Sequence, residues 1–83
     1  MHNIIKEAST LNGERGTIEI HLKKLLEDAG LSKNKFCQRA ELQHSQLNGY
    51  LNNTITRLDI DVLIRICDTL DCSISDLLEY KPR

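Results

Sequence analysis

Histidine and cysteine have the most distinctive chemistry in this 83-residue chain, because both can bind metals and take part in catalysis. The chain contains His2, His21, His44, Cys37, Cys67 and Cys72. No two cysteines have the C-x-x-C spacing of zinc or redox sites, and the histidines are scattered. We therefore expect no metal site and no cofactor, and cysteines that are reduced and structural.

Catalytic chemistry needs groups arranged to act together. The sequence has no nucleophile and base on a shared helix face, no glycine-rich phosphate loop and no paired-carboxylate motif. We therefore predict that the chain is not an enzyme. It also shows no small-molecule site.

Recognition by hydrogen bonds is the chemistry open to a row of polar side chains in the middle of the chain. In a helix over residues 44–51, His44, Ser45 and Asn48 would lie on the outer face. Leu47 and Leu51 would face the core. Such a face presents donors and acceptors to a partner.

Helices are predicted by a device that occurs four times. An apolar residue precedes a polar cap, and a second apolar residue follows five positions later, as in a hydrophobic staple. The pairs are Leu31/Phe36, Leu42/Leu47, Leu58/Leu63 and Cys72/Leu77. Ser32, Asp59 and Ser73 are good N-caps. Helices are therefore expected to start near Lys33, His44, Ile60 and Ile74, after an earlier helix that starts near His21.

The helices over 33–40 and 44–51 are separated by so few residues that they must cross steeply, as in a helix-turn-helix. Cys37 is the small residue expected at the crossing. With this arrangement, residues 22–80 resemble the helix-turn-helix domains of the Cro and phage-repressor (XRE-like) family of transcriptional regulators. The matching stretches are LKKLLEDAGLSKNKF, LQHSQLNGYLN and TRLDIDVLIRICDTLDCSISDLLEY. The resemblance implies an all-α, five-helix, lambda-repressor-like domain that binds double-stranded DNA.

The resemblance also implies roles for individual residues, because the third helix of the family lies in the major groove. The base-contacting positions are Gln43, His44, Ser45 and Asn48. Glutamine can pair with the adenine N6/N7 edge, serine can bond to several bases, and His44 can donate to guanine N7 or O6. Positions near the DNA backbone are Lys33, Asn34, Lys35, Asn52, Asn53, Thr54 and Arg57. Lys33 and Asn34 lie at a helix N-terminus, which favours phosphate.

Charge is distributed in agreement with this reading. The net charge is only −1, but between Lys33 and Arg57 there are four basic residues and one acidic residue. Two departures from the family pattern weaken the expectation of DNA binding. Glu41 replaces the usual turn glycine, so we expect a looser or strained turn. Gly49 removes a side chain from a position that often contacts a base. The alternative is a protein-interaction module, such as an antitoxin that binds its toxin through this fold.

The chain is expected to divide into an arm over residues 1–20, a helix-turn-helix domain over 21–80 and a tail over 81–83. The alternation in Thr17–Ile20 favours a short strand or weak hairpin next to a glycine-containing turn. No signal peptide or membrane span is evident, so a cytoplasmic location in a bacterium or phage is expected.

A homodimer is expected. Its interface would be either the apolar excess of Ile60, Val62 and Ile64 or strand pairing through the arm. The alternative is a monomer whose arm folds back over Val62 or Ile64. The expected core comprises Leu22, Leu25, Leu26, Leu31, Phe36, Cys37, Ala40, Leu42, Leu47, Leu51, Leu63, Ile66, Cys67, Leu70, Leu77 and Leu78.

Overall fold

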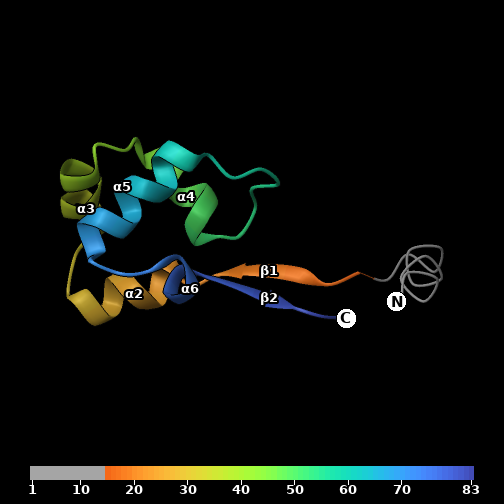
Figure 1. Cartoon of the computed structure of the whole chain (residues 1–83). Coiled ribbons are helices and arrows are strands. Elements are labelled where there is room, and N and C mark those ends of the chain that lie inside the picture. Colours follow the sequence, from red (N-terminus) through yellow and green to blue (C-terminus); the bar gives the residue numbers. More distant parts are fainter. Residues whose placement is uncertain (1–14) are drawn as a thin grey trace.

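The computed structural model describes residues 15–83. Within them, five helices and two strands follow one another along the chain (Figure 1). They are β1 (Thr17–Ile20), α2 (Leu22–Ala29), α3 (Lys33–Ala40), α4 (His44–Leu51), α5 (Ile60–Leu70), α6 (Ile74–Leu77) and β2 (Leu78–Lys81). The five-helix, lambda-repressor-like fold predicted from the sequence is confirmed.

Local capping explains why the predicted helix starts are right. The Ser32 hydroxyl accepts a hydrogen bond from the Lys35 N–H at the start of α3. The Asp59 carboxylate accepts one from the Asp61 N–H, over 2.9 Å, at the start of α5. At α6, the Ser73 hydroxyl accepts from the Asp76 N–H. Each cap supplies an acceptor to helix donors that have no partner within the helix.

The strand predicted at Thr17–Ile20 exists, but its partner was not foreseen. β1 pairs in antiparallel fashion with β2, and Ile18 lies opposite Tyr80. The sequence predicted only where the last helix starts, near Ile74, and α6 ends at Leu77 after a single turn. Leu78 and Tyr80 alternate with charged residues, a period of two that suits a strand. Figure 1 shows the two strands side by side, extending away from the helices.

The core lies between the helices and the inner end of the strand pair. The buried side chains are Ile20, Leu22, Leu26, Phe36, Cys37, Ala40, Leu42, Leu47, Tyr50, Val62, Leu63, Ile66 and Leu77. Ile20, Tyr50 and Val62 are the members that the sequence did not predict. Predicted members that are only partly buried, at the margin of this core, are Leu25, Leu31, Leu51, Cys67, Leu70 and Leu78.

Val62 corrects the interpretation of α5. It had been counted with Ile60 and Ile64 as apolar excess, but it is only 3% exposed and belongs to the core. Ile60 and Ile64 remain exposed, one helical turn apart.

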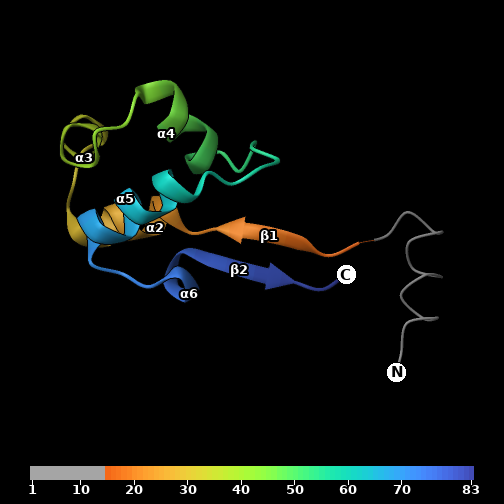
Figure 2. The ribbon, with the colours of Figure 1, turned by 45° about the horizontal axis from the view of Figure 1, so that its top comes forward.

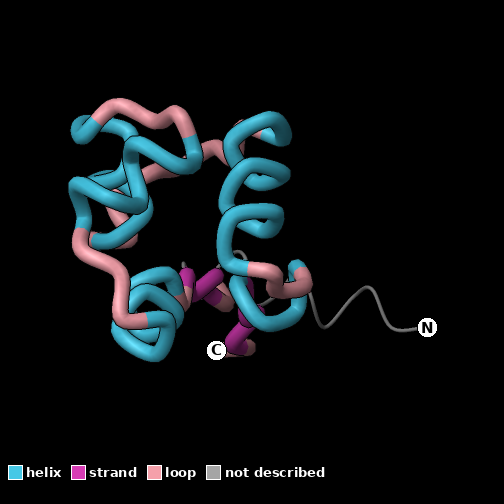
Figure 3. The backbone as a smooth tube through the Cα atoms, turned by 90° about the vertical axis from the view of Figure 1, so that its left-hand side faces the viewer, coloured by secondary structure: helices cyan, strands magenta, loops and turns pink. Residues whose placement is uncertain are grey.

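The helix-turn-helix and the strands occupy different parts of the molecule. Figure 2 shows α3 and α4 in the upper part and α6 with β2 in the lower part. Figure 3 views the molecule from its helical end, with the strands behind the helices. The helix-turn-helix is thus separated from α6 and β2 (Figure 2). No helix in residues 15–83 combines the length and apolar character needed to cross a bilayer.

Candidate nucleic-acid interface

The start of α4 presents the side chains that the sequence assigned to base contact. Gln43, His44, Ser45 and Asn48 are all exposed. Leu47, on the same helix, has no exposed surface and fixes the inner face of α4 in the core. The Gln46 side chain accepts a hydrogen bond from the Gln43 N–H over 3.1 Å, which fixes the start of the helix.

Tyr50 is a positioning residue that sequence reasoning missed. Its ring is 4% exposed, and its hydroxyl oxygen accepts a hydrogen bond from the Asp59 N–H over 3.2 Å. Asp59 is the N-cap of α5, so Tyr50 ties α4 to the beginning of the next helix. A buried tyrosine needs a partner for its hydroxyl group, and this contact supplies one.

The turn between α3 and α4 is tight although it lacks glycine. Glu41 adopts the left-handed conformation with φ 56° and ψ 47°, and the Leu42 N–H donates to the Cys37 carbonyl over 3.0 Å. The Arg65 guanidinium donates to the Glu41 carbonyl over 2.8 Å and pairs with Asp61 over the same distance. The expected loosening of the turn is therefore absent. Instead, Arg65 stabilises a conformation that glycine adopts more readily.

Gly49 has a packing role. A Cβ atom built at Gly49 would lie 2.8 Å from the Cγ2 atom of Ile55, in the loop that follows α4. A side chain at this position would therefore meet the loop after α4, which gives the glycine a packing reason that sequence reasoning did not consider. The absence of a side chain lets Ile55 pack directly against the helix.

The predicted phosphate-contacting residues divide into groups. Lys33 at the start of α3 and Asn52 after α4 line one hollow of about 400 Å³. Lys23 from α2 lines it as well, and sequence reasoning missed it because α2 lies outside the helix-turn-helix. The signal available in the sequence was the place of Lys23 on the polar face of the helix predicted to start near His21. Glu27 contributes one acidic side chain to the same hollow.

The other predicted positions lie around this hollow or away from it. Asn34 lines a shallow depression between α3 and α4 together with His44. Lys35 is exposed on the first turn of α3, and the Thr54 hydroxyl donates to the Gly49 carbonyl over 3.5 Å. Asn53 and Arg57 line a separate hollow beside β1. The Asn53 side chain is bonded to the backbone of Ile20, so it positions the loop.

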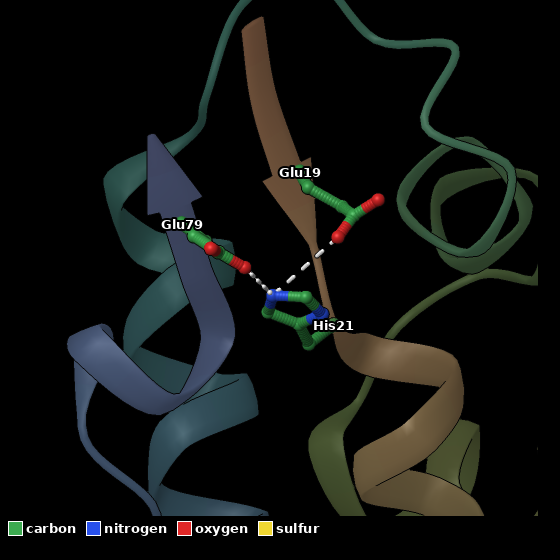
Figure 4. Close-up of side chains that lie close together, drawn as sticks. All are labelled: Glu19, His21 and Glu79. Carbon is green, nitrogen blue, oxygen red and sulfur yellow. Dashed lines mark hydrogen bonds and ion pairs between the residues drawn. The ribbon is translucent and has the colours of Figure 1, made fainter. Parts of the chain in front are cut away.

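The structure brings together one cluster that the sequence did not predict (Figure 4). The Nε2 atom of His21 lies 2.8 Å from a carboxylate oxygen of Glu79 and 3.7 Å from one of Glu19. This donor set is of a kind that can hold a metal ion. The Lys81 ammonium group lies 3.0 Å from Glu19 and competes for that carboxylate. These contacts link β1, β2 and the start of α2.

The three cysteines are free thiols. Burial raises the pKa of the Cys72 thiol to about 11, and the nearby Cys67 contributes a smaller part of this rise. Cys72 is therefore a protonated thiol near neutral pH.

Comparison with known proteins identifies the family. Residues 21–83 match the family model of the Cro/C1-type HTH DNA-binding domain. No curated protein sequence matches the chain. Among solved structures, the crystal structure of the transcriptional regulator VanUg is similar, with a TM-score of 0.67 and 22% sequence identity. The match covers 84% of this chain and 92% of that chain, and at this identity it shows a shared fold. The chain belongs to the Cro/C1-type helix-turn-helix DNA-binding domain family.

Proposed function

We propose that the protein is a cytoplasmic, sequence-specific transcriptional regulator that binds double-stranded DNA and is not an enzyme. The observation that carries the proposal is the start of α4. Polar side chains gather there on an exposed surface, while Leu47 and Tyr50 hold the opposite face in the core. An exposed, well-anchored helix end of this kind can enter the major groove.

The proposal assigns two kinds of contact with DNA. Gln43, His44, Ser45 and Asn48 contact base edges and determine which sequence is preferred. Lys33, Asn34 and Lys35 lie on the first turn of α3 and contact phosphate. Lys23 joins this group because it lines the same hollow as Lys33. Asn52 lines this hollow as well, and Thr54 and Arg57 approach the DNA backbone from the loop after α4.

The test is selection of bound sequences from random double-stranded DNA, followed by binding measurements at increasing salt. A preferred sequence should emerge. The association constant should fall as the salt concentration rises, because binding releases cations from the DNA phosphates and this release is less favourable at high salt. If the folded protein shows no salt-dependent DNA binding, the proposal is wrong.

One observation favours a second candidate, a module that binds a protein partner. Glu41 is exposed in the turn of the helix-turn-helix, where a carboxylate would be repelled by phosphate. The sequence isoelectric point of about 6.3 points the same way. The two functions are separated by the same salt series, since a partner-only module would not bind DNA at any salt concentration.

We also propose that the protein acts as a homodimer. Few basic side chains surround α4, so one copy makes few phosphate contacts and binds weakly. Two copies related by a two-fold axis would contact half-sites about 34 Å apart, one turn of DNA.

A further inference from the structure

Within residues 15–83, the outer edge of β1 is closed at Ile20 and has no hydrogen-bond partner at Ile18, the next outward-facing residue. The Ile20 N–H donates to the Asn53 side-chain oxygen over 2.8 Å, and the Asn53 amide donates to the Ile20 carbonyl over 3.3 Å. The backbone groups of Ile20 therefore point away from β2. In an antiparallel pair this direction alternates, so those of Ile18 and Gly16 point outward as well. Beside Ile18 lies an open hollow of about 180 Å³.

The same alternation makes the strand pair amphipathic. Thr17, Glu19, Glu79 and Lys81 share one face, and Ile18, Ile20, Leu78 and Tyr80 share the other. On the apolar face, Ile20 is buried in the core, but Ile18 is 52% exposed and Tyr80 is 64% exposed. A two-stranded sheet alone is marginally stable in water, so an apolar face beyond the core favours further pairing.

We propose that a second copy of this chain pairs with the free edge of β1, in antiparallel fashion and centred on Thr17. This inference rests on the proposed homodimeric function and identifies its interface. The result is a four-stranded sheet in the order β2–β1–β1–β2, with a two-fold axis between the two central strands. The self-pairing of an identical strand across a two-fold axis is the symmetric way to satisfy an open edge.

Centring on Thr17 follows from the side chains and backbone groups at the edge. In this register, Thr17 faces Thr17 of the second copy, and Glu19 faces Arg15 of the second copy. Opposite charges directly across a sheet stabilise the pairing. The outward backbone groups of Ile18 meet those of Gly16, so both sets find partners. Pairing stops at Ile20, whose groups Asn53 already occupies.

The neighbouring registers are less favourable. Centring on Glu19 would place two carboxylates opposite each other, which is destabilising. Centring on Ile18 would place Gly16 opposite Ile20, whose backbone groups are already bonded to Asn53. Among registers that pair only residues 15–20 with one another, centring on Thr17 satisfies the outward groups of both Gly16 and Ile18.

Gly16 also fits this arrangement. A Cβ atom at Gly16 would lie 2.5 Å from the ring of Tyr80, so this ring lies across the glycine. In the proposed register, Ile18 of the second copy lies opposite Gly16 and therefore beside this ring. The exposed Ile18 and Tyr80 side chains of both copies then form one apolar strip.

Crosslinking through engineered cysteines tests the register. Thr17→Cys should form a disulfide between the two copies in the presence of oxidised glutathione. The two Thr17 residues would form a non-hydrogen-bonded pair, whose Cα atoms lie about 4.5 Å apart. Ile18→Cys is the matched control. Its two copies would lie more than about 7 Å apart, beyond disulfide reach. Equal crosslinking of the two variants, or none by Thr17→Cys, would overturn the register.

Sedimentation tests the apolar strip. Ile18→Thr, which keeps a β-branched side chain, should weaken the dimer by about tenfold or more, because both copies lose an apolar contact. Ile64→Thr is the control, since Ile64 is 53% exposed but lies on α5. Circular dichroism would verify that both variants are folded. An equal effect of the two substitutions, or an unmodified protein that is monomeric at tens of micromolar, would refute the proposal.

Failure of this inference can be told apart from failure of the proposed function. A monomer that binds DNA in a salt-dependent way would refute the strand pairing and leave the regulator intact. A dimer that crosslinks at Thr17→Cys but does not bind DNA would support the pairing and refute the regulator.

Discussion

The side-chain amide of Asn53 bonds to both backbone groups of Ile20, so a loop residue takes the place of a neighbouring strand at that position. The two residues are 33 positions apart. Asn53 has φ 56°, a left-handed conformation that asparagine tolerates better than most residues. The contact holds the loop after α4 against the base of the strand pair.

Asn53→Ala should lower the free energy of unfolding by about 1–3 kcal/mol, because two hydrogen bonds are lost and the left-handed backbone is strained. Asn53→Gly is the control, since glycine removes the bonds but relieves the strain, so its loss should be smaller. Urea unfolding measures both values. An Asn53→Ala variant as stable as the unmodified protein would contradict this role.

Gly49→Ala should destabilise the protein, although alanine is the better helix former by about 1 kcal/mol. The new methyl group would meet Ile55 at 2.8 Å, and crowding of this kind costs about 1–3 kcal/mol. The matched comparison is Gly49→Ala in an Ile55→Ala background, where the cost should disappear. Thermal unfolding of the four proteins gives the coupling energy, and additive effects would disprove the contact.

Asp76 should contribute stability that depends on pH. Hydrogen bonds from the Ser73 backbone N–H and side chain lower the pKa of Asp76 below its ordinary value of 3.8. A carboxyl group with a lowered pKa in the folded state stabilises the protein above the unfolded-state pKa, and this contribution is lost as pH falls through the folded-state value. Asp76→Asn should therefore show a smaller loss of stability between pH 5 and pH 3. Equal losses in urea unfolding would argue against the cap.

Lys33 and His44 should have different effects on DNA binding. Lys33→Ala should weaken binding on all sequences and reduce the salt slope by about 1, whereas His44→Ala should change the preferred sequence. Lys24→Ala is the control, because Lys24 pairs with Asp28 on α2 and lies outside the proposed interface. The measurement is binding to selected and random DNA over a salt series. Uniform loss in both variants would show that the assignment of roles is wrong.

The helices could be predicted from the sequence because their signals are local. Ser32, Asp59 and Ser73 each bond within three residues of themselves, so cap and helix start appear together in the sequence. The strand β2 could not be predicted in this way. Its four residues are stabilised by pairing with β1 at the other end of the described chain, and a four-residue stretch carries little information of its own.

The residues that position the candidate site were missed for the same reason. Arg65 bonds to the Glu41 carbonyl across 24 positions, and Gly49 is explained only by Ile55 packing over it. Nothing near Glu41 in the sequence indicates that an arginine on a later helix stabilises its backbone. The exposed side chains of α4, in contrast, could be predicted from helical periodicity once its start was known.

Because Thr17 pairs with Lys81, the first residue of β1 and the last residue of β2 lie together at the outer tip of the strand pair. Tension applied through the two chain ends would therefore peel the strands apart one residue pair at a time, instead of shearing all pairs at once. The pairs would open from Thr17–Lys81 towards Ile20–Leu78 before any force reached α2 or α6. A load in this direction would thus open the strand pair before it acted on the helix-turn-helix.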